Sequence, residues 1–144
     1  MRIDDIDQID ADIDWFATDS NGHILHVASG GGILPESVAA SEEELLELHQ
    51  YFLTRPETDT TVEAEEDTDA GSYRGFARYA RRGLFSFAKT RLHERADTRY
   101  YLVARPAQPL TVAELPERIA GLLGRSKLPG DVAEQSTFDV ATVS

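Results

Sequence analysis

Two pairs of short apolar segments constrain the fold of this chain most strongly. The first pair, DWFAT and HILHVAS, is separated by residues 19–22, whose sequence DSNG favours a tight turn. The second pair, LFSFAKT and RYYLVAR, is joined by a longer polar stretch. Strands connected by short loops pair with each other in antiparallel fashion. The pattern therefore predicts two β-hairpins.

The spacing of apolar residues outside the hairpins predicts three main helices. They run from Ser41 to Arg55, from Tyr73 to Gly83 and from Pro116 to Gly124. We therefore expect an α+β fold, in which two antiparallel β-hairpins form one sheet with about three helices packed on one face. A single domain is expected over residues 1–128, and the polar segment 129–144 is expected to be a flexible C-terminal tail.

Composition removes several classes of protein. The chain has no cysteine, which excludes thiol catalysis, disulfides and cysteine-ligated zinc. The opening residues, MRIDDIDQID, lack the apolar run of a signal peptide, and no stretch reaches membrane-spanning length. We therefore expect a cytoplasmic protein with no membrane partner.

Charge is distributed unevenly along the chain. The first 70 residues carry two basic and nineteen acidic side chains, whereas the remaining 74 carry twelve basic and seven acidic ones. Such a chain either pairs its two halves with each other or presents an acidic face to a basic partner. The acidic half would repel phosphate, so nucleic acid is an unexpected ligand there.

Two motifs resemble ligand sites but lack essential positions. The aspartates of DADID (10–14) have the spacing of a calcium loop, yet Trp15 and Asn21 occupy the places of its glycine and its bidentate glutamate. The glycine run 30–32 follows a strand, as a phosphate loop would, but no Lys-Ser/Thr pair follows it. We expect no metal and no cofactor, and we expect the aspartate-rich N-terminal edge to contribute little.

The histidines do not form an evident active site. His23 and His26 are three residues apart in a predicted strand, so they should point to opposite faces and cannot bind one metal together. Catalysis would require at least two of His26, His49 and an acid to converge in a pocket. No serine occupies a nucleophile elbow. We therefore expect a protein that is not an enzyme.

The acidic residues of the central segment are the strongest candidates for binding a partner. A helix N-terminus gains only tenths of a kcal/mol from each carboxylate, so local stability does not require this many. The candidate partner-binding residues are Glu42, Glu43, Glu47, Glu57, Asp59, Glu63, Glu65, Glu66, Asp67 and Asp69. Trp15 or Tyr51 would serve as an aromatic anchor if either is exposed.

An arginine-rich segment supports an alternative function. Residues 74–105 carry nine basic and two acidic side chains with aromatic residues between them, a composition typical of single-strand nucleic-acid binding. The same arginines would instead stabilise the fold if 74–82 lay over the acidic loop 57–69. The sequence leaves both possibilities open.

Three stretches of the chain together resemble a known group of proteins. They are DIDWFATDSNGHILHVASGGGILPESV, GLFSF and YYLVARPAQPLTVAELPERI. These motifs resemble small bacterial immunity proteins of polymorphic toxin systems, which neutralise an antibacterial toxin in the cell that produces it. The resemblance implies a non-enzymatic antitoxin whose partner is a cognate toxin with a basic surface, and residues 55–75 lie outside it, as a variable contact region would.

Overall fold

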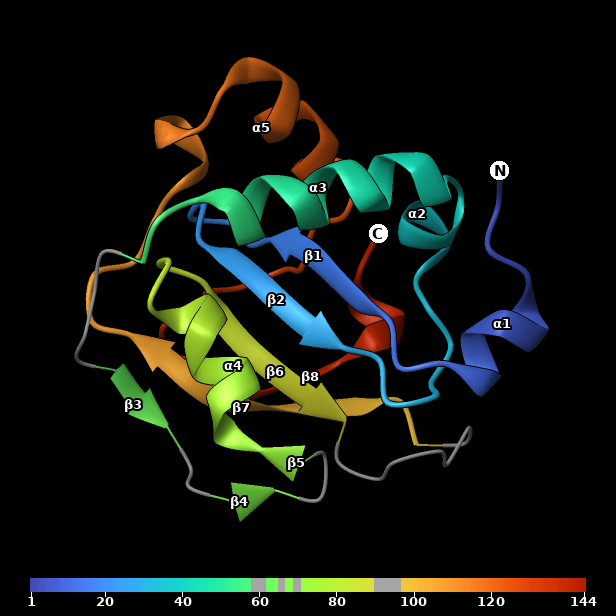
Figure 1. Ribbon diagram of the computed structural model, residues 1–144, viewed down its shortest axis with the longest axis horizontal. Coiled ribbons are helices and arrows are strands. Elements are labelled where there is room, and N and C mark those ends of the chain that lie inside the picture. The colour runs from blue at the N-terminus through green and yellow to red at the C-terminus, as the bar shows by residue number, and fades with distance from the viewer. Residues whose placement is uncertain (58–61, 65–66, 69–70, 90–96) are drawn as a thin grey trace.

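A mixed β-sheet forms the centre of the molecule (Figure 1). The computed structural model describes the backbone of residues 1–57, 62–64, 67–68, 71–89 and 97–144, and the side chains of 1–57, 76–89 and 97–144. The main sheet has the order β1-β2-β6-β7-β3, and β8 pairs with β7 outside this path. Its strands are β1 (Asp14–Thr18), β2 (Ile24–Ala28), β3 (Val62–Ala64), β6 (Phe85–Lys89), β7 (Arg99–Pro106) and β8 (Thr137–Asp139). A separate short pair consists of β4 (Asp67–Thr68) and β5 (Gly71–Ser72).

The α+β class and both predicted hairpins are confirmed, but the way the hairpins join was not predicted. β1 pairs with β2 and β6 pairs with β7, each in antiparallel fashion. Gly22 has a φ of 80°, which the first turn requires. The two hairpins meet through a parallel pairing of β2 with β6, in which His26 lies opposite Ser86. Parallel neighbours need a long crossover connection, and residues 29–84 provide it.

The described ranges contain five α-helices, whereas about three were expected. They are α1 (Asp5–Asp10), α2 (Glu36–Ala39), α3 (Glu42–Thr54), α4 (Tyr73–Ala80) and α5 (Glu117–Leu123). The predicted cap of α3 is present, since the Ser41 hydroxyl accepts a hydrogen bond from the Glu44 amide at 3.2 Å. α3 and α4 cover one face of the sheet, and α5 packs on α3 and β1. None of the helices in the described ranges combines the length and the hydropathy that a transmembrane helix requires.

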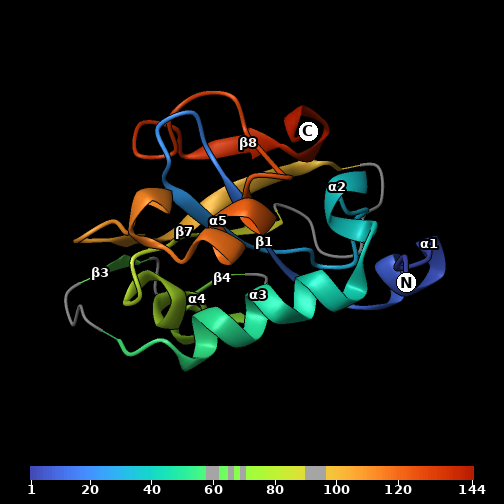
Figure 2. The same ribbon diagram turned by 90° about the horizontal axis from the view of Figure 1, so that it is seen from above.

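The opposite face of the sheet is covered by the C-terminal segment (Figure 2). We expected 129–144 to be a polar, flexible tail, but four of its apolar side chains are buried, Val132 completely and Phe138 to 7% exposure. The Phe138 ring stacks on Tyr100 and meets the rings of Trp15 and Phe87 edge-on. The segment is polar on average, and its role in the core depends on four apolar positions that a composition argument overlooks: Val132, Phe138, Val140 and Val143.

We predict that Phe138→Ala lowers the free energy of unfolding by about 3–5 kcal/mol, because it leaves a cavity among Trp15, Phe87 and Tyr100. Urea denaturation of the full chain measures this. The exposed neighbour Thr137 supplies the control, and Thr137→Ala should cost less than about 1 kcal/mol. Equal effects of the two substitutions would show that the C-terminal segment does not stabilise the core.

Candidate functional site

Three of the four described carboxylates that were expected to bind a partner form ion pairs within the molecule. Glu47 forms a two-pronged pair with Arg118, with both N–O distances at 2.9 Å. Glu43 contacts the amino group of Met1, and Glu57 lies 3.3 Å from Arg82. Glu42 is exposed and forms no ion pair within the described part of the chain. The remaining candidates have side chains outside the described residues: Asp59, Glu63, Glu65, Glu66, Asp67 and Asp69.

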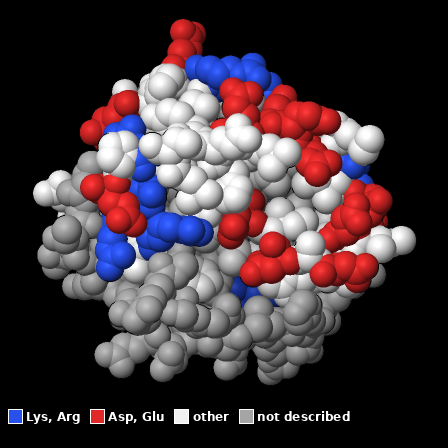
Figure 3. All heavy atoms as spheres, viewed as in Figure 1, with Lys and Arg blue, Asp and Glu red and all other residues white. Residues whose placement is uncertain are grey.

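Arginines of the second half hold elements of the first half in place. Arg82 donates to the carbonyl oxygens of Leu53 and Arg55, and so ties the end of α4 to the end of α3. Arg125 pairs with Glu44 across α5 and α3. In Figure 3 the acidic side chains gather over α1 and the start of α3, whereas basic ones gather over α4 and the far end of α3. Part of the charge asymmetry therefore stabilises the fold, and the N-terminal part remains acidic.

A cavity of about 470 Å³ lies in this acidic region, between the N-terminal segment and α3. We define it as the acidic cavity. Its apolar lining includes Ile3, Ile13, Leu45 and Leu46. Its charged lining residues are six carboxylates, one arginine and Met1 with its amino group, namely Asp4, Asp7, Asp10, Asp12, Asp14, Glu42, Arg2 and Met1. We expected the N-terminal aspartates to contribute little. That expectation overlooked the cavity because one of its walls is formed by α3, which is distant in the sequence.

Asp14, at the start of β1, is held at the cavity by side chains from three other elements. Its Oδ1 lies 2.8 Å from Nε2 of His26 in β2, and its Oδ2 accepts a hydrogen bond from the Tyr79 hydroxyl of α4 at 3.5 Å. His49 of α3 also lines the cavity, with its Nε2 3.2 Å from the Tyr79 oxygen and 3.7 Å from Oδ2 of Asp14. Behind Asp14, the His26 ring stacks on Tyr79, and its Nδ1 lies 2.6 Å from the Ser86 hydroxyl.

The surroundings keep Asp14 ionised and His26 neutral. Partial burial would raise the pKa of the Asp14 carboxyl, but the hydrogen bond from His26 and nearby positive charge outweigh it, so the pKa is lowered. Burial lowers the pKa of His26 despite the opposing effect of Asp14. Burial and the Asp14 charge raise the pKa of Tyr79 to about 12. The network therefore places a fixed negative charge beside the cavity.

The convergence that catalysis would require does occur here, since His26, His49 and Asp14 meet at one place. Ser86, His26 and Asp14 even form a serine–histidine–aspartate chain. Ser86, however, is completely buried in β6, so no substrate carbonyl can reach its hydroxyl. The groups that line the cavity, Asp14 and His49, can bind a cation or exchange a proton.

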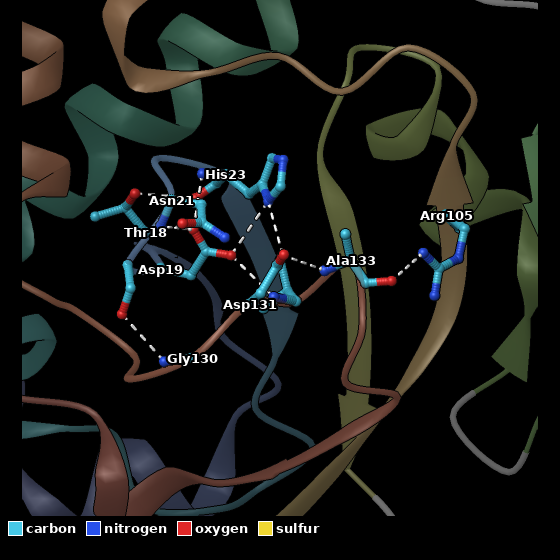
Figure 4. Close-up of polar contacts among 10 residues, drawn as sticks. Thr18, Asp19, Asn21, His23, Arg105, Gly130, Asp131 and Ala133 are labelled. Atoms are coloured by element: carbon cyan, nitrogen blue, oxygen red, sulfur yellow. Dashed lines mark hydrogen bonds and ion pairs between the residues drawn. The ribbon is translucent and has the colours of Figure 1, made fainter.

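A second polar cluster joins the first hairpin to the C-terminal segment (Figure 4). Asp19 accepts hydrogen bonds from the amides of Asn21, His23 and Val132, each at 2.9 Å. Nδ1 of His23 lies 3.3 Å from Asp19 and 3.1 Å from Asp131. These three side chains are the only group with metal-ligand spacing in the described ranges. Both carboxylate oxygens of Asp19 and Oδ1 of Asp131 accept hydrogen bonds from backbone amides, so the cluster acts as a clasp between distant segments.

The other sequence motifs have structural roles. As predicted, His23 and His26 do not share a site. The carboxylate of Asp12 accepts the Gly30 amide at 2.9 Å, so a negative group occupies the place where a phosphate loop would bind its anion. Trp15 is completely buried and cannot serve as an aromatic anchor. Tyr51 is half-buried, and its hydroxyl accepts a hydrogen bond from Arg55.

Comparison with known proteins gives no relative for this arrangement: no family model, curated protein or solved structure matches the chain. The function must therefore be argued from the acidic cavity and the sequence motifs.

We predict that His26 makes the protein less stable as the pH falls. The histidine of the unfolded chain takes up a proton near pH 6.5, whereas burial lowers the pKa of His26 in the folded state. The unfolded state then binds more protons below that pH, so the free energy of unfolding decreases. His26→Gln removes this contribution. Urea denaturation at about pH 7.5 and 5 should show a smaller decrease for the variant, and equal decreases would contradict the prediction.

We predict that Asp19→Asn lowers the free energy of unfolding by about 1–3 kcal/mol, because the new amide group turns a donor toward buried backbone N–H groups. Thermal or urea unfolding tests this, with Glu134→Gln as the control at an exposed position beyond the clasp. A loss no larger than that of the control would mean that the clasp does not stabilise the fold.

Proposed function

We propose that this protein is a non-enzymatic immunity protein that binds and neutralises a cognate toxin domain with a basic surface. The observation that carries the proposal is the acidic cavity, whose lining residues include six carboxylates but only two cationic groups, Arg2 and the amino group of Met1. A toxin that acts on nucleic acid must present positive charge to phosphate, so a nuclease or a nucleic-acid-modifying enzyme is the partner whose surface this region complements. The resemblance of the sequence motifs to immunity proteins supports the same function.

The acidic region combines charge with apolar contact area. Complementary charge accelerates encounter and disfavours wrong partners, whereas stable binding also needs buried apolar surface. Leu46 on α3 is 50% exposed and Ile6 on α1 is 70% exposed. Both lie among the carboxylates of the same region, and Leu46 lines the cavity itself. This composition favours a protein partner over a simple counterion.

The alternative, nucleic-acid binding through 74–105, has less support from the described side chains. Arg82 and Arg105 donate to backbone carbonyl oxygens, which uses them within the fold. Arg99 contacts Asp97, and Lys89 is 1% exposed. Arg78 is exposed and lies over the Tyr79 ring. A face that binds a phosphate backbone would need several exposed cations in a row.

The proposal predicts that expressing this chain rescues cells from the toxin encoded beside it and that the two proteins purify as a complex. Glu42→Gln combined with Asp12→Asn should weaken the complex, because both residues line the acidic cavity. Glu117→Gln, which removes an exposed carboxylate of α5, is the matched control. Growth assays and calorimetric titration measure the two effects. Absence of rescue and of binding would rule out the immunity function, and binding of single-stranded nucleic acid at low salt would favour the alternative.

A further inference from the structure

We propose that the acidic cavity receives one arginine side chain of the partner and that Asp14 is the carboxylate that anchors it. The inference rests on the proposed function, because it identifies which group of a basic partner the cavity binds. Three features of the site carry it: the charge state of Asp14, the apolar wall of the cavity and the arrangement of its carboxylates on two elements.

The first feature is a fixed negative charge that forms no ion pair with a lysine or arginine among the described residues, although Arg78 is near enough to help lower the pKa of Asp14. Asp14 is about one-third exposed, and its ion-pair partners among the described residues are the two histidines His26 and His49. His26 is 2% exposed and held neutral by burial. It fixes the position of the carboxylate without neutralising it. A partly buried charge is stabilised by an opposite charge, and here the cavity is the open side from which one can approach.

The second feature is an apolar wall that suits an aliphatic stem. Leu45 and Leu46 of α3 line the cavity together with Ile3 and Ile13 of the N-terminal segment. Arginine buries its methylene groups along apolar surface while its charged end contacts polar groups. A hydrated metal ion or a small inorganic cation would gain nothing from this wall. A volume of about 470 Å³ is sufficient for one long side chain.

The third feature is the placement of carboxylates on both sides of the cavity. Asp12 and Asp14 belong to the N-terminal segment, and Glu42 begins α3. A guanidinium group carries five N–H donors in one plane and can bond two carboxylates at once, whereas a lysine ammonium acts as a point charge. Tyr79 and His26 already use part of the hydrogen-bonding capacity of Asp14, which limits the directions from which a new donor can approach.

The cavity can be tested without the partner by titrating the ¹⁵N-labelled full chain with N-acetyl-arginine amide. Backbone amide shifts near Asp12, Asp14 and Leu46 should move with a Kd of millimolar order, as is reasonable for a single side chain. N-acetyl-citrulline amide has the same shape without the charge and should leave them unchanged. Asp14→Asn should abolish the response and Glu117→Gln should preserve it. No response to the arginine probe, or an equal response to citrulline, would overturn the proposal.

The second arm uses the toxin complex. Asp14→Asn should weaken toxin binding on the order of 30-fold, as truncating one member of a desolvated charge pair does. Glu42→Gln, at an exposed position of the same cavity, should weaken toxin binding by a smaller factor. This second variant keeps the test valid if Asp14→Asn does not fold. A complex that forms with unchanged affinity in both variants would overturn the arginine anchor while leaving the immunity function intact. If the wild-type chain forms no complex with the toxin, the proposed function itself is refuted.

A free polyamine is the competing occupant, and the titration distinguishes it. Spermidine offers several ammonium groups on a flexible apolar chain, and it should bind no more tightly than millimolar if the cavity is built for an arginine of a protein. Micromolar binding of spermidine, lost in Asp14→Asn, would overturn the proposal in favour of a small-molecule site.

Discussion

The parallel pairing of β2 with β6 is the contact on which the rest of the structure depends. It joins the two hairpins into one sheet, and it places Leu25 opposite Phe85 at the centre of that sheet. The same register puts His26 beside Ser86, whose hydroxyl is hydrogen-bonded to Nδ1 of the histidine ring. Because His26 in turn holds Asp14, the geometry of the cavity follows from a strand pairing between residues about 60 positions apart.

Burial on both faces explains why the sheet tolerates so few polar side chains. α3 and α4 cover one face, and the C-terminal segment covers the other through Phe138. β2 and β6 are buried along their whole length, as is usual for strands enclosed from both sides. His26 and Ser86 are exceptions within this core, and each satisfies the other. A buried polar pair of this kind has a clear function here, since it positions a carboxylate at the edge of the sheet.

Local signals in the sequence identified much of the fold. The turn at 19–22, the Ser41 cap and the glycine after α5 act over a few residues, and each predicted element is present. The carboxylates were harder to interpret, because Glu47 and Asp14 are both acidic residues next to an apolar run. One meets Arg118 and the other faces a cavity. That difference arises from the packing of α5 against α3 and from the contact of the N-terminal segment with the start of α3, which no local pattern contains.

The sequence by itself determined the α+β class, the two hairpins, the main helices and the excess of negative charge in the first half. These properties depend on residue spacing, turn chemistry and composition. Only the tertiary structure decided that the hairpins join in parallel, that 129–144 completes the core and that the N-terminal aspartates surround a cavity together with Glu42 of α3. The physical reason is that ion pairing and burial depend on which distant segments come into contact. The sequence around a carboxylate does not specify which of them will be its partner.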